Sequence, residues 1–343
     1  MSTWTDPELQ HIFLNQTPLI DVRAPIEFLD GKIPFSVNLP IMNNEERSLV
    51  GTTYKEKGQA EAIRLGHELV SGELKQERIR AWRDFILEHP QCQVFCFRGG
   101  LRSQTTCQWL QEIGINKAPI PGGYKRLRQF FISILEDAPL PNMIRIGGPT
   151  GSAKTHFLKT IHNHVDLEEL AHHRGSAFGS RGEQPSQITF ENNLALEFLK
   201  LKDKTIYVED ESATIGRITL PRRYFYHHRH SDMIILEVSF QERIRNIHAD
   251  YVTSADSEKL FLALDRIKKS LGGVNYQLIK DEMTLAFNAG KELRHHEGWI
   301  GLLLKHYYDP LYLRDIQRQP GRILFRGTAR ELQSFIQQSR IKS

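Results

Sequence analysis

A loop around residue 96 carries the residue types of an anion-binding nucleophile. Cys96 is followed by two arginines, Arg98 and Arg102, with glycines at positions 99 and 100 between them. Glycines let consecutive backbone N–H groups converge on an anion, and arginines add forked donors. A thiol in such surroundings has a lowered pKa and is substantially thiolate, the form that attacks electrophiles. We therefore predict a reactive cysteine whose anion cradle also comprises Gly99, Gly100, Leu101 and Ser103.

Two other interpretations of this loop are a buried structural cysteine and a cysteine phosphatase. Burial alone would not call for two glycines and two arginines, whereas Cys92 and Cys107 lack such neighbours and are expected to be structural. The Cys-x5-Arg-Ser spacing that starts at Cys96 is also that of cysteine phosphatases, so hydrolysis of a phosphate ester competes. Phe95 argues against it, because those phosphatases usually have histidine directly before the cysteine.

A second anion site is predicted at residues 148–155, which read G-P-T-G-S-A-K-T. The segment fits the phosphate-binding pattern G-x-x-x-x-G-K-[ST], except that Ala153 replaces the second glycine. Its amides can wrap a phosphate, with Lys154 on an outer phosphate and Thr155 on Mg²⁺. A chance match is the alternative, but the strand and helix expected on either side favour a true phosphate loop. We predict a diphosphate or triphosphate site formed by Gly148, Gly151, Ser152, Ala153, Lys154 and Thr155.

Charged segments further along the chain predict additional contacts. Glu209 and Asp210 follow an expected strand, where a second metal or polar site would lie, although a solvated acidic turn fits equally well. Residues 222–230 mix cations with aromatic side chains, which suits phosphate contacts and base stacking on RNA. A charged helix face with packing aromatics fits this segment equally. The candidate RNA contacts are Arg174, Arg222, Arg223 and Arg229.

The composition is that of a globular protein with room for two domains. The chain has 343 residues, of which 40% are hydrophobic and 25% charged, and its net charge of +4 permits anionic partners without identifying one. It contains no apolar run of roughly 20 residues and begins with no secretion signal, so we expect a cytoplasmic protein. Three cysteines without metal-ligand spacing make a disulfide framework or a zinc site improbable.

Short apolar runs in the first half predict the sheet that positions the cysteine. Strands are expected at residues 18–23, 37–40 and 93–97. Helical spacing covers 60–87, with an interruption near Gly72, and returns at 103–113. Cys96 therefore lies on a strand-to-helix turn.

The second half repeats this arrangement after a proline-containing linker at 137–142. The phosphate loop lies between a strand at 143–146 and a helix over 154–162. Further strands are expected at 205–208 and 233–238, with the spacing that parallel crossovers need. We predict an α/β protein with parallel-sheet domains at 1–138 and 139–343.

The cysteine loop resembles that of a rhodanese domain, in which the cysteine carries sulfur as a persulfide. The upstream segments D-V-R-x-x-x-E-F, from Asp21, and G-K-I-P, from Gly31, support this resemblance. With a phosphate-loop domain attached, the chain resembles the bacterial tRNA 2-selenouridine synthase family. The segments that carry the resemblance are 46–54, 95–103, 121–125, 147–155, 170–179, 209–212, 215–216 and 307–310.

This resemblance implies a rhodanese-like domain fused to a P-loop NTPase-like domain that binds tRNA and a diphosphate. The implied activity is a transferase acting on 2-thiouridine at the wobble position of tRNAs for lysine, glutamate and glutamine. The sulfur is first geranylated by geranyl diphosphate, and selenium from selenophosphate then replaces the geranylthio group through an S-selanyl intermediate on Cys96. The resemblance implies no tightly bound cofactor, leaves Mg²⁺ open through Thr155, and is consistent with a monomer without a membrane partner.

Each loop then has its own part in the reaction. The phosphate loop would stabilise the departing diphosphate, and an apolar slot beside it would take the geranyl chain. The aromatic segment 305–312 is first interpreted as packing against the core, and a wall of this slot is the alternative. Three other functions compete with this one. They are a sulfurtransferase with a nucleotide-regulated domain, a cysteine phosphatase or small-molecule kinase fusion, and an RNA-binding adaptor without catalysis.

Overall fold

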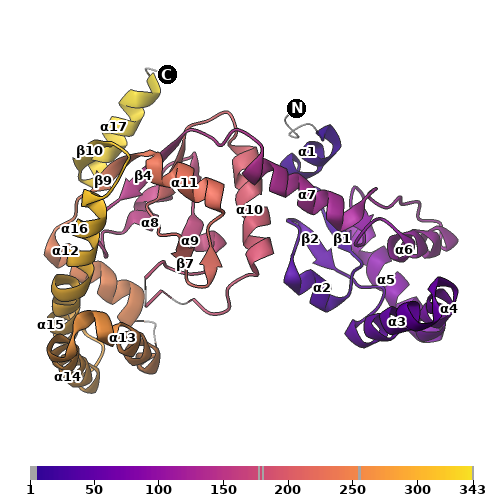
Figure 1. Ribbon diagram of the computed structural model, residues 1–343, viewed down its shortest axis with the longest axis horizontal. Coiled ribbons are helices and arrows are strands. Elements are labelled where there is room, and N and C mark those ends of the chain that lie inside the picture. The colour runs from indigo at the N-terminus through magenta and orange to yellow at the C-terminus, as the bar shows by residue number, and fades with distance from the viewer. Residues whose placement is uncertain (1–5, 177, 180, 254–255, 342–343) are drawn as a thin grey trace. The chain divides into compact units, whose positions relative to one another are not determined.

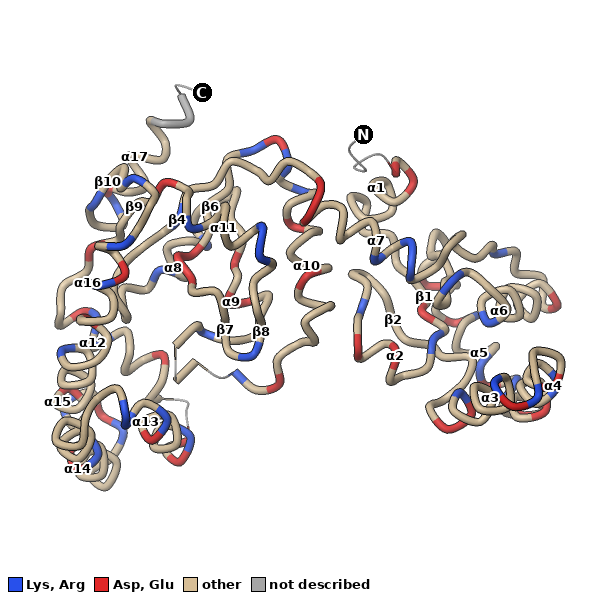
Figure 2. The backbone as a smooth tube through the Cα atoms, viewed as in Figure 1, with Lys and Arg blue, Asp and Glu red and all other residues tan. Residues whose placement is uncertain are grey.

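The computed structural model describes residues 6–176, 178–179, 181–253 and 256–341. The chain divides into two compact units (Figure 1). We call the first the cysteine unit; it comprises residues 1–139 and 186–200. The second, the P-loop unit, comprises residues 140–185 and 201–343. Lysine and arginine positions are interspersed with acidic positions along the backbone of both units (Figure 2).

The cysteine unit is built on a three-stranded parallel sheet with the order β2-β1-β3. The strands are β1 (Leu19–Asp21), β2 (Ser36–Asn38) and β3 (Gln93–Phe95). They confirm the predicted strands of the first half, although each is shorter. The central strand β1 is completely buried, which explains its apolar sequence. Cys96 directly follows β3 at the carboxyl edge of the sheet, where parallel sheets commonly place functional loops.

Seven helices of this unit come from the first 139 residues. The helix break predicted near Gly72 lies between α4 and α5, and the predicted helix at 103–113 begins two residues earlier, at Leu101. The helices are α1 (Pro7–Leu14), α2 (Pro25–Asp30), α3 (Asn44–Lys57), α4 (Gln59–Leu69), α5 (Gly72–Glu88), α6 (Leu101–Glu112) and α7 (Gly123–Glu136).

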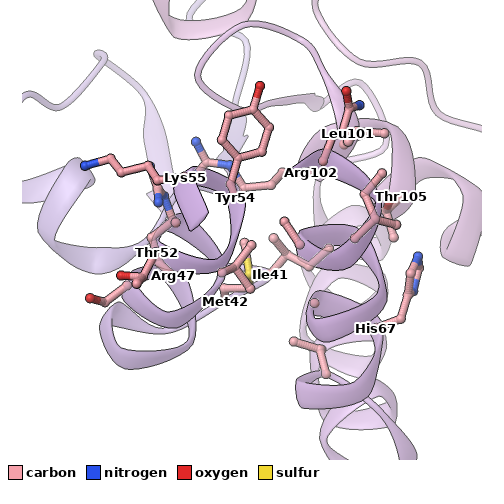
Figure 3. Close-up of a pocket in the computed structure, with 18 of the residues that line it drawn as sticks. Ile41, Met42, Arg47, Thr52, Tyr54, Lys55, His67, Leu101, Arg102 and Thr105 are labelled. Carbon is pink, nitrogen blue, oxygen red and sulfur yellow. The ribbon is translucent and has the colours of Figure 1, made fainter. Parts of the chain in front are cut away.

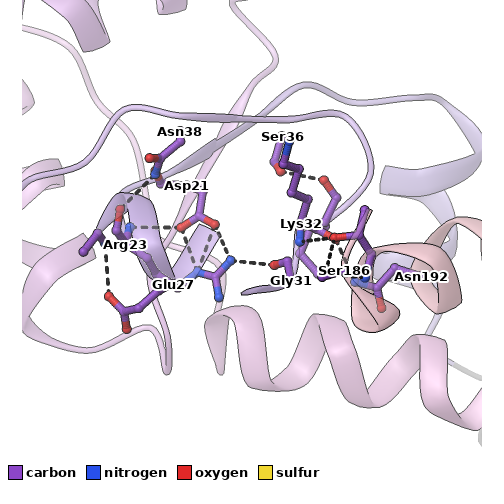
Figure 4. Close-up of polar contacts among 12 residues, drawn as sticks. Asp21, Arg23, Glu27, Gly31, Lys32, Ser36, Asn38, Ser186 and Asn192 are labelled. Atoms are coloured by element: carbon purple, nitrogen blue, oxygen red, sulfur yellow. Dashed lines mark hydrogen bonds and ion pairs between the residues drawn. The ribbon is translucent and has the colours of Figure 1, made fainter. Parts of the chain in front are cut away.

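An eighth helix, α10 (Gln187–Lys200), joins the cysteine unit from a distant part of the sequence. The Asn192 amide donates a hydrogen bond to the Lys32 carbonyl at 2.8 Å, and the Thr189 hydroxyl accepts one from the Lys32 N–H at 3.0 Å (Figure 4). Arg128 of α7 also donates to the Asn192 side chain at 2.8 Å. A single boundary between residues 138 and 139 would assign α10 to the second domain. Its amphipathic pattern specifies a buried face but not the core that buries it.

The P-loop unit contains a five-stranded parallel sheet with the order β10-β9-β4-β6-β5. Its three inner strands confirm the predicted ones, whereas the two edge strands were not predicted. The strands are β4 (Met143–Gly147), β5 (His164–Val165), β6 (Ile206–Glu209), β9 (Asp232–Leu236) and β10 (Ile323–Gly327). A small antiparallel pair, β7 (Thr214–Ile215) and β8 (Ile218–Thr219), lies apart from this sheet. Because β4 and β6 are neighbours, the phosphate loop and residues 209–211 emerge at the same edge.

Helices make up most of the rest of the P-loop unit. The helix predicted over 154–162 is present but shorter than predicted: α8 (Lys154–Leu158) ends at Leu158, and turns follow. The others are α9 (Leu167–Leu170), α11 (Arg222–His230), α12 (Phe240–Ile247), α13 (Ser257–Leu271), α14 (Gly273–Ala289), α15 (Leu293–Leu303), α16 (Asp309–Gln317) and α17 (Ala329–Ile341), with π-helical turns η1 (His248–Val252) and η2 (Leu304–Tyr308). Among the described residues, no helix is long and apolar enough to cross a bilayer.

Candidate functional site

The thiol of Cys96 is buried; it accepts a hydrogen bond from the Ser103 hydroxyl and donates to the Gly100 carbonyl at 3.8 Å. Only 3% of the residue is exposed, and the Ser103 hydroxyl donates to Sγ at 3.1 Å. Burial acts to raise the pKa of Cys96. The opposing effects are larger in sum and lower this pKa below its usual value. They come from hydrogen bonds donated by the Ser103 hydroxyl and by the N–H groups of Ser103 and Arg98, and from the charge of Arg102. The arrangement therefore favours a thiolate at the carboxyl edge of the sheet.

The other two cysteines lack this environment. Burial raises the pKa of Cys92, and it raises that of Cys107 to about 11, with the nearby Cys96 adding to the effect. All three cysteines lie in the described part of the chain and are free. Cys96 is therefore the one cysteine in the chain whose thiol is held in an anion-stabilising environment.

The segment Pro121–Lys125 holds the cysteine loop in place. The Tyr124 N–H donates to the Cys96 carbonyl at 2.8 Å, and the Lys125 N–H donates to the Phe97 carbonyl at 3.0 Å. A side chain at Gly123, where φ is +52°, would overlap with the Cys96 carbonyl oxygen. This supporting role was not predicted, although the two adjacent glycines at 122 and 123 are a sequence signal for a close approach of two backbone segments.

The two arginines of the loop are placed differently. Arg102 is mostly buried and donates to both carboxylate oxygens of Glu27, at 2.5 and 3.1 Å. Arg98 is exposed, and its guanidinium lies 5.7 Å from the centre of the Phe97 ring. Arg98 thus contributes its backbone N–H to the thiol, while Arg102 contributes charge in an orientation that Glu27 maintains.

A buried ion pair anchors the carboxyl end of the neighbouring strand β1. Asp21 accepts hydrogen bonds from the Arg23 guanidinium, the shortest at 2.6 Å, and both residues are at most 2% exposed (Figure 4). Arg23 also donates to the Gly31 carbonyl at 2.9 Å and lies 3.7 Å from the centre of the Tyr124 ring. The pair therefore links β1 to the segment that supports the cysteine loop.

The phosphate loop follows β4, and helix α12 holds its carbonyl groups. The Arg243 side chain donates to the Thr150 carbonyl at 2.8 Å, and the Asn246 amide donates to the Gly151 carbonyl at 2.9 Å. Because a trans peptide directs its N–H opposite to its carbonyl, the N–H groups that follow these carbonyls point away from α12. Lys154 folds back, and its ammonium group donates to the Gly148 carbonyl at 2.9 Å.

Ala153 adopts the left-handed conformation that its position in the pattern reserves for glycine. Its φ is +59° and its ψ is 38°, and it caps α8 (Lys154–Leu158). This conformation costs a non-glycine residue about 1–2 kcal/mol. The loop thus keeps the expected backbone path in spite of the extra methyl group.

A cluster of carboxylates lies beside the phosphate loop. The Thr155 hydroxyl donates to Glu168 at 3.1 Å. Glu209 is 1% exposed, and neither of its carboxylate oxygens has a hydrogen-bond partner. Burial, followed by the nearby Glu168, raises the pKa of Glu209 well above its usual value. Asp210 instead accepts a hydrogen bond from the buried Arg145 at 2.7 Å.

The predicted acidic pair therefore separates into two roles. Asp210 balances Arg145, whereas Glu209 retains free oxygens. Glu168 was not predicted, because it comes from an unrelated part of the sequence. Within the described residues, no group of three or more His, Cys, Asp or Glu side chains is arranged to hold a metal. The oxygens of Thr155 and Glu209 still fit Mg²⁺, which keeps several waters and substrate oxygens in its coordination shell.

A cavity of about 560 Å³ opens in front of the phosphate loop. Lys154, Arg174 and Arg181 contribute cations to its wall, and Tyr308, Leu311 and Tyr312 contribute apolar surface. Part of the aromatic segment predicted as a wall at 305–312 therefore does line it. A smaller apolar cavity adjoins and shares Ile247, Tyr251 and Tyr308, and it continues to Trp299, Leu303 and Leu304.

The four arginines predicted to contact RNA lie in two places. Arg174 lines the cavity in front of the phosphate loop, donates to the Asp250 carbonyl at 2.7 Å, and lies 5.1 Å from the centre of the Tyr251 ring. The other three are on α11, where Arg222 is exposed, Arg223 is half-buried, and Arg229 pairs with Asp315 at 3.2 Å.

Helix α11 combines the two interpretations of residues 222–230. Tyr224 and His228 are completely buried, and burial lowers the pKa of His228 to about 3, so these side chains pack as part of the core. Tyr226 is 67% exposed and its ring lies 4.1 Å from that of His230. One face of the helix is therefore structural, and the other presents cations and an aromatic ring.

Comparison with known proteins places these features in a family. A family model described as the tRNA 2-selenouridine synthase AAA domain matches residues 141–343. A tRNA 2-selenouridine synthase from Marinobacter nauticus is 46% identical over 92% of this chain and 93% of its own length. Proteins of the same name from Sulfurovum sp. and Shewanella sp. strain MR-7 are 42% and 44% identical over at least 96% of both chains.

Proposed function

The chain belongs to the tRNA 2-selenouridine synthase family, and from this premise we propose that it replaces the sulfur of 2-thiouridine in tRNA with selenium. The substrate nucleoside is the wobble uridine of tRNAs for lysine, glutamate and glutamine. One observation carries the proposal: a stabilised thiol and a phosphate loop occur in one chain, each at the carboxyl edge of its own parallel sheet. The parallel sheet and the loop after β3 support a rhodanese-like fold for the cysteine unit.

The first step uses geranyl diphosphate in the P-loop unit. The 2-thio sulfur attacks the allylic carbon, so a C–S bond forms, a C–O bond breaks, and pyrophosphate leaves. Lys154 and the loop N–H groups stabilise the negative charge of the leaving group. Tyr308, Leu311 and Tyr312 offer the geranyl chain an apolar wall beside that charge. Mg²⁺, where used, would be held by Thr155 and Glu209 and would add further positive charge.

The second step uses the cysteine unit. Arg102 and the loop N–H groups hold the phosphate portion of selenophosphate, and the Cys96 thiolate attacks its phosphorus, so that an S–P bond forms and the P–Se bond breaks. The selenide released in the site bonds to carbon 2 of the nucleoside, the bond from carbon 2 to the geranylthio group breaks, and geranylthiol leaves. Water then cleaves the S–P bond, which releases phosphate and restores the Cys96 thiol. The lowered pKa of the Cys96 thiol supports this step, because a thiolate is the reactive form.

Mass spectrometry of nucleosides tests the proposal. The chain is incubated with 2-thiouridine tRNA, geranyl diphosphate and selenophosphate, and S-geranyl-2-thiouridine should appear before 2-selenouridine. Cys96→Ser should abolish selenation and leave geranylation measurable, and Cys107→Ser should leave both steps intact. Equal loss of geranylation in Cys96→Ser would refute the division of the reaction between the two units.

A further inference from the structure

A second cavity, of about 770 Å³, lies wholly within the cysteine unit. Helices α3, α4 and α6 form its walls, and the segment before α3 forms its floor (Figure 3). Most of its lining is apolar, including Met42, Val50, Ala62, Ile63, Leu101 and Trp109. Its volume lies within the roughly 300–1,000 Å³ typical of small-molecule sites. The apolar slot predicted from the sequence lies beside the phosphate loop, in the other unit.

This cavity and the reactive cysteine share the first turns of helix α6, although Cys96 itself is buried and does not line the cavity. Leu101, Arg102 and Thr105 line it, and all three lie in the first turns of α6, the helix that follows the cysteine loop. Ser103, in the same turn, donates its hydroxyl hydrogen to the Cys96 sulfur. A ligand seated in the cavity would therefore have one end near the first turn of α6, where the thiol is held.

The charges of the cavity bear on the kind of ligand. Arg47, Lys55 and Arg102 are its cations, and no acidic side chain is among the described residues that line it. Glu27, which does not line the cavity, pairs with Arg102 at 2.5 Å and with Arg47 at 3.7 Å, so the positive charge of these two arginines is partly balanced. Figure 3 shows Arg47, Lys55 and Arg102 among the residues drawn with Ile41 and Met42, and the Lys55 side chain extends away from these two. Arg47 is 40% exposed, so it can meet a phosphate without leaving solvent. An apolar chain attached to a polyanion fits this combination.

We propose that this cavity holds the geranyl group of S-geranyl-2-thiouridine while the modified base faces Cys96. The inference rests on the proposed function, because that function supplies an RNA that carries a ten-carbon apolar chain. The cations would contact RNA phosphates next to the modified nucleoside. The P-loop cavity then serves geranyl diphosphate as donor, and the cysteine-unit cavity serves the geranylated RNA.

The proposal explains why an apolar cavity belongs beside a thiol that transfers selenium. The geranyl chain distinguishes the activated nucleoside from unmodified or merely thiolated uridine. Burial of that chain would give RNA that is ready for selenation a higher affinity than its precursor. The cavity is thus a specificity determinant for the second step.

The test uses the full chain, selenophosphate and a synthetic anticodon stem-loop that already contains S-geranyl-2-thiouridine. Thr105→Trp, at a half-buried position of α6, fills the cavity, and Ile63→Asp places a carboxylate in its wall at a position that is 37% exposed. At subsaturating RNA, we expect each variant to make 2-selenouridine at least about tenfold more slowly. Geranylation of a 2-thiouridine stem-loop should stay at the wild-type rate.

Leu87→Asp is the matched control, because Leu87 is 67% exposed, lies on α5 of the same unit and does not line the cavity. Alkylation of Cys96 by iodoacetamide shows whether the cysteine loop is intact in each variant. If Thr105→Trp loses that reactivity, Ile63→Asp decides the outcome. Wild-type selenation in Ile63→Asp, or an equal loss in Leu87→Asp, would overturn the inference. Failure of the wild-type protein to convert the geranylated RNA would instead overturn the proposed function.

Discussion

The cavity in front of the phosphate loop and the cavity of the cysteine unit differ in how their charges are arranged. The cavity of the P-loop unit combines cations such as Lys154 and Arg181 with the carboxylates Glu168 and Glu211. The cavity of the cysteine unit has cations at an apolar wall and, among the described residues, no acidic lining; the Glu27 carboxylate that pairs with Arg102 and Arg47 does not line it. Mixed charge suits a diphosphate with a metal ion, whereas cations beside apolar surface suit an alkyl chain on a polyanion. Under the proposed function, the cavity of the P-loop unit would receive geranyl diphosphate and the cavity of the cysteine unit the geranylated RNA.

The largest expected effect tests whether the two sites act independently. Lys154→Ala should slow geranylation by about 100-fold or more, because a cation that stabilises the leaving diphosphate is lost. Selenation of RNA that is already geranylated should proceed at the wild-type rate, as measured by nucleoside mass spectrometry. A comparable loss in both assays would refute the independence of the two sites. The control is Lys159→Ala, which alters an exposed cation that lines the same cavity.

The next effect concerns the thiol of the cysteine unit. Ser103→Ala should raise the pKa of Cys96, because a hydrogen bond to sulfur is lost, and Arg102→Gln should raise it less, because charge at a distance is the weaker cause. The pH dependence of iodoacetamide alkylation measures both shifts. Cys107, with a pKa of about 11, should contribute little, and Cys107→Ser tests this. A larger shift for Arg102→Gln would mean that the charge, rather than the hydrogen bond, holds the thiolate.

A smaller effect is expected from the carboxylates of the P-loop unit. Burial, followed by repulsion from Glu168, raises the pKa of Glu211 to about 8, whereas 4.5 is its usual value. Between these two values the folded chain binds more protons than the unfolded chain, so stability falls as pH rises. The melting temperature should therefore decrease from pH 5 to pH 8, and Glu211→Gln should reduce that decrease.

Two further measurements sharpen the stability prediction. Glu331→Gln is the control, because hydrogen bonds from Thr328 hold the pKa of Glu331 below its usual value, so that it stays ionised throughout this window. Mg²⁺ with pyrophosphate should also flatten the decrease, since positive charge favours the ionised carboxylates. An unchanged slope in Glu211→Gln would remove this residue from the explanation.

The smallest effect is expected at Ala153. Glycine would relieve the cost of the left-handed conformation but would also increase the entropy of the unfolded chain, so Ala153→Gly should raise stability by no more than about 1 kcal/mol. Urea denaturation of the P-loop unit, followed with a probe in that unit, measures the change. Pyrophosphate affinity should be unchanged, because the backbone path is already that of the pattern. A marked gain in affinity would show that the alanine constrains the loop.

Features with a local cause were predicted well from the sequence. The inner strands β4, β6 and β9 are continuous apolar runs, and the break near Gly72 follows from the properties of glycine. The edge strand β10 was missed because its side chains are largely exposed and show no buried pattern. The predicted boundary between residues 138 and 139 does not separate residues 187–200 from the second half, whereas the structure places helix α10 in the cysteine unit.

The sequence alone determined the two anion-binding loops. One is Cys96 with its glycines and arginines, and the other is Lys154 with Thr155 after a strand. Local sequence is enough for such loops because backbone wrapping of an anion depends on neighbours within a few residues. The tertiary structure decided which distant residues complete them. Glu27 orients Arg102, Glu168 meets Thr155, and α3, α4 and α6 enclose the cavity beside the thiol. Such contacts depend on how helices and strands pack around a shared core, and no local pattern of residues records that packing.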